Sequence, residues 1–115
     1  GFDRDAWTAR LTEAAGVAEF DLYGYEPAWR SERSSPLARA FLRAIRSQQG
    51  TPRFKVKTGT ADLNVLGPVW GCPIAAYGPG DSTLDHTPNE HISITEYERA
   101  ISVLSTALTE AGFAS

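Results

Sequence analysis

Two short runs with apolar side chains, residues 54–57 and 73–77, set the strongest limit on how this chain can fold. We interpret both as strands of the kind that lie buried in parallel sheets. Helical patterns flank them, over residues 35–50 and residues 93–112. Because the order helix, strand, strand, helix is typical of α/β layers, the sequence predicts an α/β fold for residues 36–115.

Both flanking helices carry sequence signals at their starts. Ser35 followed by Pro36 suits a helix start, because serine caps the free N–H groups and proline needs none at the first helical position. Ser93 and Glu96 form a capping-box pair at the start of the last helix. An apolar stripe then runs along that helix and is made of Tyr97, Ile101, Leu104 and Leu108.

The first part of the chain follows a different pattern. Residues 3–15 predict a helix that ends at Gly16, and residues 18–23 alternate between apolar and polar side chains. Such alternation is typical of a strand in an antiparallel sheet with one solvated face. Residues 29–35 belong to a polar, irregular stretch that we interpret as a linker. Further on, residues 59–71 are rich in turn residues and leave room for a short helix.

Bulk composition narrows the class of protein. At 42% hydrophobic and 22% charged residues, the chain is expected to be globular. Its formal net charge of -3 at pH 7 argues against nucleic acid or a membrane surface as a partner. A single cysteine, Cys72, cannot form an intrachain disulfide, and the first residues do not resemble a secretion signal, so we expect a cytoplasmic protein. The chain has no methionine, and we therefore expect that residue 1 is not the natural start of translation.

The segment with the most chemical content is the loop at residues 77–92, directly after the second predicted strand. In an open α/β sheet, loops that leave the carboxyl ends of strands form the binding crevice. Gly78 and Gly80 allow the backbone to approach a ligand, and N–H groups in such a turn can hold a carboxylate or phosphate. His86 is a candidate metal ligand beside an aspartate. A plain turn and a solvated histidine remain the alternatives, and nothing favours a ligand role for His91.

Three segments, at residues 57–62, 78–81 and 86–90, occur in an order and spacing that resemble the C-terminal third of the two-zinc amidohydrolases. This family includes acetylornithine deacetylase, succinyl-diaminopimelate desuccinylase and bacterial aminoacylases. Residues 77–81 and 84–92 are most similar to the subgroup that releases lysine or ornithine from a carrier protein.

Carried over residue by residue, the resemblance implies that His86 is the last zinc ligand of the site. The residues that line the substrate pocket would be Gly59, Thr60 and Asp62. Gly78 and Gly80 would bring backbone N–H groups toward the substrate carboxylate. The family's other ligands come from a His-x-Asp segment, a bridging aspartate and a glutamate pair that includes the general base, and none of these is matched in this sequence. The resemblance therefore implies no catalytic residue in this chain, which alone should be inactive and hold no zinc.

The same resemblance implies a division of the chain. Residues 1–28 would be the last helix and strand of an α+β lid or dimerisation domain, and residues 29–35 the linker. Residues 36–115 would be the C-terminal part of a zinc-hydrolase catalytic domain with a mixed or parallel sheet. The full-length protein would be a homodimer that holds two zinc ions, or cobalt in their place. Its substrate would be a small-molecule N-acyl amino acid, or lysine or ornithine on a small acidic amino-group carrier protein, in lysine and arginine biosynthesis.

Two functions other than that of a hydrolase stay open. The chain can be a non-catalytic fragment or an assembly module, in which a strand at residues 20–25 offers its edge to another chain. A weaker alternative is a carboxylate- or phosphate-binding module without chemistry, which rests on the glycines of the loop. An upstream sequence that contains His-x-Asp would favour the enzyme.

Overall fold

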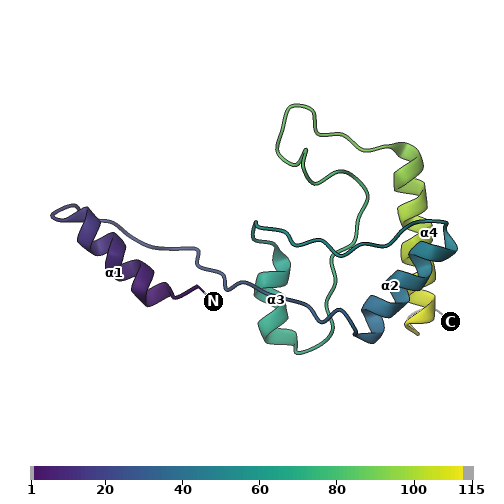
Figure 1. Cartoon of the computed structure of the whole chain (residues 1–115), viewed down its shortest axis with the longest axis horizontal. Coiled ribbons are helices and arrows are strands. Elements are labelled where there is room, and N and C mark those ends of the chain that lie inside the picture. The colour runs from purple at the N-terminus through teal and green to yellow at the C-terminus, as the bar shows by residue number, and fades with distance from the viewer. Residues whose placement is uncertain (1, 113–115) are drawn as a thin grey trace.

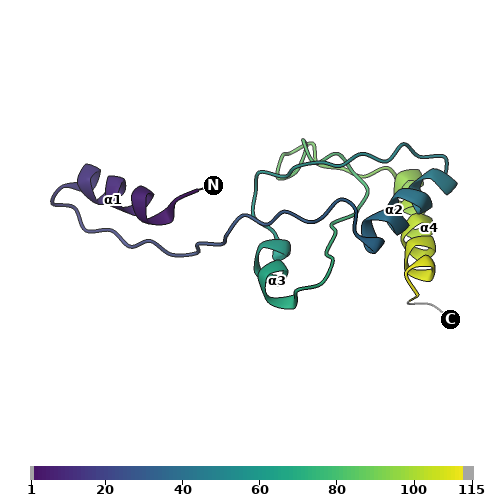
Figure 2. The same cartoon turned by 60° about the horizontal axis from the view of Figure 1, so that its bottom comes forward.

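Four helices organise the computed structural model, which describes residues 2–112 (Figure 1). In chain order they are α1 (Arg4–Ala15), α2 (Pro36–Ser47), α3 (Asp62–Trp70) and α4 (Ile94–Glu110). The two views show α2 and α4 side by side, with α1 at the opposite end of the molecule (Figures 1 and 2). Over this described range, no helix has both the length and the apolar composition needed to cross a membrane.

The predicted starts of α2 and α4 are confirmed. The Ser35 hydroxyl accepts a hydrogen bond from the Ala38 N–H at 3.1 Å, and Pro36 occupies the first helical position. The Ser93 hydroxyl accepts from the Glu96 N–H at 3.4 Å. Each serine thus satisfies one of the N–H groups that the first turn of a helix leaves without a partner.

The contact between α2 and α4 contains the apolar core. Ala44 of α2 and Val103 and Ala107 of α4 are at most 1% exposed, and Phe41 and Ile45 pack against them. Alanines at the contact let the two helix backbones approach closely. At the edge of the contact, the Arg43 Nε donates to the Glu110 Oε2 at 2.6 Å. Both side chains of this pair are partly exposed, so the apolar contact contributes more to stability than the ion pair does.

The apolar stripe of α4 does not lie in that contact. The buried face of α4 consists of Ala100, Val103 and Ala107, whereas the larger side chains of the stripe lie on another side of the helix. Tyr97 and Ile101 of the stripe are each 52% exposed, Leu104 is 44% exposed and Leu108 is 38% exposed. The stripe therefore predicts the helix correctly but not the face that packs on α2.

The other two helices are shorter or less buried. α1 begins at Asp3, whose Oδ1 accepts from the Ala6 N–H at 3.0 Å, and it has no buried residue. α3 confirms the short helix expected within residues 59–71. The Asn64 Oδ1 accepts from the Ala61 N–H at 2.9 Å at its start, and Gly71 ends it in the left-handed conformation with φ 60°.

The predicted strands at residues 18–23, 54–57 and 73–77 are not formed in this structure. A strand needs hydrogen bonds to a neighbouring strand, and residues 2–112 contain no such ladder. Phe54 and Val56, which alternate with lysines, are 48% and 81% exposed. The sheet, and the parallel pairing of its strands, therefore remain predictions that the structure does not confirm.

Candidate functional site

The candidate site is the loop at residues 77–92, which lies between α3 and α4, and its first residue packs on α2. Tyr77 lies against Phe41 of that helix, with ring centroids 5.1 Å apart. Partial burial raises the pKa of the Tyr77 hydroxyl, and the negative charge of Glu96 acts in the same direction. Since Ser93 caps α4 at the other end, the loop leaves and returns to the same pair of helices.

A series of tight turns shapes the middle of this loop. The Asp81 Oδ1 accepts from the Thr83 N–H at 3.0 Å, and this hydrogen bond lowers the pKa of the Asp81 carboxyl. Three backbone hydrogen bonds follow, from Leu84 N–H to Asp81 O, from Thr87 N–H to Leu84 O and from Glu90 N–H to Thr87 O. Their lengths of 2.9, 3.0 and 3.1 Å show that the loop is folded on itself and is not an extended connection.

The two histidines of the loop differ in their surroundings. The His91 Nδ1 lies 2.6 Å from the Asn89 carbonyl oxygen, so one of its ring nitrogens is held by the loop's own backbone. The exposed His86 ring forms no hydrogen bond within the described range, and its backbone has a positive φ of 63°. Its N–H donates to the Glu90 Oε2 at 2.8 Å. Of the two imidazoles, only that of His86 therefore has both nitrogens available to a ligand or metal.

An ion pair joins this loop to the other predicted motif. The Lys57 Nζ donates to the Asp85 Oδ2 at 3.1 Å, although 28 residues separate the two in the chain. Lys57 opens the 57–62 segment, and Asp85 directly precedes His86. Across residues 2–112, this is the one side-chain link between the two segments.

The predicted substrate-binding residues occupy two places around this link. Gly59 and Thr60 are exposed and follow Lys57 closely, and Asp62 is exposed at the first position of α3. Gly78 and Gly80 belong to the same loop as His86, and the φ of 99° at Gly80 requires a glycine or a strained residue. The structure thus brings the start of one segment to the loop, and within residues 2–112 no hydrogen bond or ion pair joins Gly59, Thr60 or Asp62 to His86.

Two contacts of α3 were not predicted from the sequence. The Asn64 Nδ2 donates to the Pro27 carbonyl oxygen at 2.7 Å, which ties the stretch before the linker to α3. The Trp29 ring lies against Gly67, where an added Cβ would be 2.3 Å from the Trp29 Cδ2. A tryptophan within a polar stretch is the one signal that could have indicated a packed segment there.

The donor set does not make a complete metal site. Described residues 2–112 contain no group of three or more His, Cys, Asp or Glu side chains placed to hold a metal ion. Catalytic zinc takes three protein ligands and structural zinc takes four. His86 can fill one ligand position, but the residues of this chain do not fit a whole zinc site.

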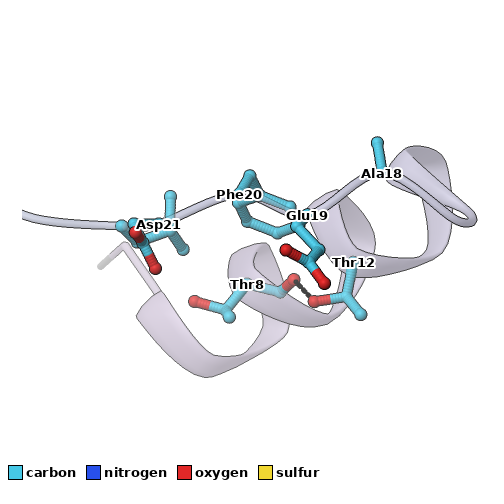
Figure 3. A pocket seen from close by; sticks show the side chains of 7 residues that line it. Thr8, Thr12, Ala18, Glu19, Phe20 and Asp21 are labelled. Atoms are coloured by element: carbon cyan, nitrogen blue, oxygen red, sulfur yellow. Dashed lines mark hydrogen bonds between the residues drawn. The ribbon is translucent and has the colours of Figure 1, made fainter.

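Two open grooves lie elsewhere on the molecule. The first lies between α1 and the chain that follows it, with a volume of about 770 Å³. Figure 3 shows its side chains and the hydrogen bond from the Thr12 Oγ1 to the Thr8 carbonyl oxygen. The second, of about 470 Å³, lies where Cys72 and Pro73 approach α2 and the end of α4. None of the predicted site residues lines either groove, so the loop remains the candidate site.

Comparison with known proteins gives matches along most of the chain. A sequence profile described as peptidase family M20/M25/M40 matches residues 7–110. The LysW-lysine hydrolase of Deinococcus radiodurans is 53% identical over 92 residues, which cover 80% of this chain and 25% of that protein. A Pyrococcus furiosus protein, provisionally named LysW-lysine/LysW-ornithine hydrolase, is also 53% identical over 92 residues, covering 80% of this chain and 28% of its own length. The LysW-lysine/LysW-ornithine hydrolase of Sulfurisphaera tokodaii is 40% identical over 77 residues, with coverages of 67% and 22%. The chain therefore spans about a quarter of the length of these curated relatives.

Proposed function

The chain belongs to peptidase family M20/M25/M40, and we propose from this membership that it is part of a metal-dependent hydrolase that releases an amino acid by cleaving an amide bond. The membership confirms the resemblance that the three segments indicated. The relatives named above are hydrolases, and this chain matches about a quarter of their length. In this proposal the activity belongs to a longer protein that contains this sequence.

The ion pair between Lys57 and Asp85 is the observation that carries the proposal. It brings the start of the 57–62 segment to the residue beside His86, so that two motifs far apart in sequence meet at one place. In this proposal His86 is one metal ligand of the site. Gly59, Thr60 and Asp62, with Gly78 and Gly80, lie around the substrate.

The proposed metal is zinc, or cobalt in its place, and this chain supplies only part of its ligand set. The other ligands and the general base come from residues that this 115-residue sequence does not contain. Because one histidine cannot complete a site, the chain by itself should be inactive and retain no zinc. Residues 36–115 are assigned to a catalytic domain with an α/β sheet, residues 1–28 to the end of a lid or dimerisation domain, and residues 29–35 to the linker between them.

The proposed substrate is lysine or ornithine attached to a small acidic carrier protein, as in lysine and arginine biosynthesis. The names of the relatives support this choice over a free N-acyl amino acid, because each names a LysW-linked amino acid as what that protein hydrolyses. The backbone N–H groups at Gly78 and Gly80 are suited to the carboxylate of the released amino acid.

The test compares two substrates with a longer protein that contains this sequence. Release of lysine or ornithine should be much faster from the carrier protein than from N-acetyl-lysine. The same protein with Gly80→Ala should lose affinity for both substrates, since alanine is strained at φ 99°. Equal rates on the two substrates would contradict the proposed carrier protein, and no hydrolysis of either would contradict the proposed activity.

A second candidate function is a non-catalytic assembly module. The exposed stripe of α4 favours it, because four large apolar side chains lie together on a helix face that the described residues 2–112 leave partly exposed. The same stripe also fits a helix that covers part of the hydrolase interior. Hydrolysis by the longer protein would decide for the enzyme.

A further inference from the structure

His86 adopts a backbone conformation that side chains usually avoid. Its φ of 63° is in the left-handed region, where within residues 2–112 Gln49 is the only other residue besides glycine. Gln49 follows the end of α2, and its N–H donates to the Arg46 carbonyl oxygen at 2.9 Å, so an ordinary helix ending accounts for it. His86 is the third residue of the turn closed by the Thr87 N–H and the Leu84 carbonyl oxygen, a position that takes a positive φ in a type II turn and that glycine usually fills. A histidine there is strained, so the turn needs additional stabilisation.

A carboxylate four residues later supplies that stabilisation. The Glu90 Oε2 accepts from the His86 N–H at 2.8 Å, and across the described residues this is the one hydrogen bond of the His86 main chain. The Glu90 N–H in turn donates to the Thr87 carbonyl oxygen at 3.1 Å, which turns the chain back toward His86. A hydrogen bond to an ionised acceptor is stronger than one between neutral groups. Glu90 is therefore placed to hold the otherwise disfavoured conformation.

We propose that Glu90 is a positioning residue that holds the backbone of His86 in the left-handed conformation and so fixes the point from which the imidazole projects. The inference rests on the proposed function, in which His86 is a metal ligand. It assigns Glu90 no contact with metal or substrate. A ligand on a constrained backbone loses less freedom on binding than one on a mobile loop, so the loop is prepared for the ligand role before the metal arrives.

Two substitutions of Glu90 separate the acceptor from the charge. Glu90→Gln keeps a side-chain oxygen that accepts a hydrogen bond, whereas Glu90→Ala removes it. Glu98 of α4 provides a matched control, because it is an exposed glutamate whose carboxylate has no hydrogen bond within residues 2–112. If the effect of Glu90→Ala comes from the loss of any surface carboxylate, Glu98→Ala should show the same effect.

The first measurement uses this chain and needs no metal. Amide hydrogen exchange of His86, followed by NMR, should speed up roughly tenfold in Glu90→Ala, as expected when one hydrogen bond to a charged acceptor is lost. Glu90→Gln should retain most of the protection, and Glu98→Ala should leave it unchanged. Exchange that is equally slow in Glu90→Ala and the parent chain would overturn the inference.

The second measurement uses a longer protein that contains this sequence and separates the inference from the proposed function. Glu90→Ala should lower zinc affinity and kcat/KM about 10–100-fold, the usual range for loss of a group that orients a metal ligand, and Glu90→Gln should recover most of both. If His86→Ala leaves hydrolysis and zinc content intact, the part of the proposed function that makes His86 a metal ligand fails. If His86→Ala abolishes hydrolysis while Glu90→Ala behaves like Glu98→Ala, the positioning role fails and the proposed function stands.

Discussion

Replacing Val103 by alanine tests the packing of α4 on α2, on which the loop depends. Val103 is 1% exposed and forms a buried cluster with Ala44 and Ala107, with Phe41 and Ile45 packed against it. Val103→Ala removes two buried methyl groups, worth about 0.8 kcal/mol each by transfer. The helices close only part of the space left behind, so the expected loss in the free energy of unfolding is about 2 kcal/mol. This corresponds to a roughly 30-fold change in the folding equilibrium constant.

Urea unfolding followed by far-UV circular dichroism measures that loss. Val69→Ala is the matched control, because Val69 is 76% exposed on α3 and alanine favours a helix more than valine does. It should change the free energy of unfolding by no more than about 0.5 kcal/mol. Equal shifts of the urea midpoint in the two variants would refute the assignment of Val103 to the core of this chain.

Ser35, Ile101 and Asp81 offer further tests of the helix cap, the exposed stripe and the loop. Ser35→Ala should cost about 1 kcal/mol and shorten α2, because the N-cap hydroxyl is lost; unchanged helicity and urea midpoint would contradict this. Ile101→Lys should reduce self-association in sedimentation and the binding of an apolar dye, since Ile101 belongs to the exposed stripe; a parent chain that is a compact monomer without dye binding would contradict the exposed surface. Because the pKa of Asp81 is lowered in the folded loop, its contribution to the turn is complete above the ordinary carboxyl pKa and is lost as pH falls through the lowered value. The NMR signal of the Thr83 N–H should follow that loss in acid and should become independent of acid in Asp81→Asn, which keeps the acceptor.

Local signals in the sequence predicted the helices well. Ser35 with Pro36, and Ser93 with the residues after it, occupy the cap positions that the pattern assigned to them. Capping depends on a side chain and an N–H three residues apart, so the information lies within one turn of the chain. The same holds for Asp3 at the start of α1.

Features that depend on distant partners were not predictable in the same way. The stripe of α4 indicates an amphipathic helix, but not whether Val103 or Leu104 faces α2. That choice depends on which face fits the alanines of α2. The predicted strands at residues 54–57 and 73–77 likewise need partners for their backbone groups, and residues 2–112 provide none.

At the candidate site, the sequence indicated the residues but not the ion pair and hydrogen bonds that connect them. The glycines and histidines of the loop could be selected by their chemistry. The ion pair between Lys57 and Asp85 spans 28 residues and requires the three-dimensional structure. The role of Glu90 depends on the positive φ of His86, and histidine adopts that conformation too rarely for the sequence to reveal it.

The most direct test of the account compares His86→Ala with His91→Ala in a longer protein that contains this sequence, with zinc content and amide hydrolysis measured for both. The two residues lie on the same loop, so general damage to the loop should affect both variants alike. We expect His86→Ala to lose most activity and part of the bound zinc. His91→Ala should stay close to the parent protein, because the His91 ring is held by the Asn89 carbonyl and not by a metal. Equal losses in the two variants, or full activity in His86→Ala, would contradict the assignment of His86 as a metal ligand.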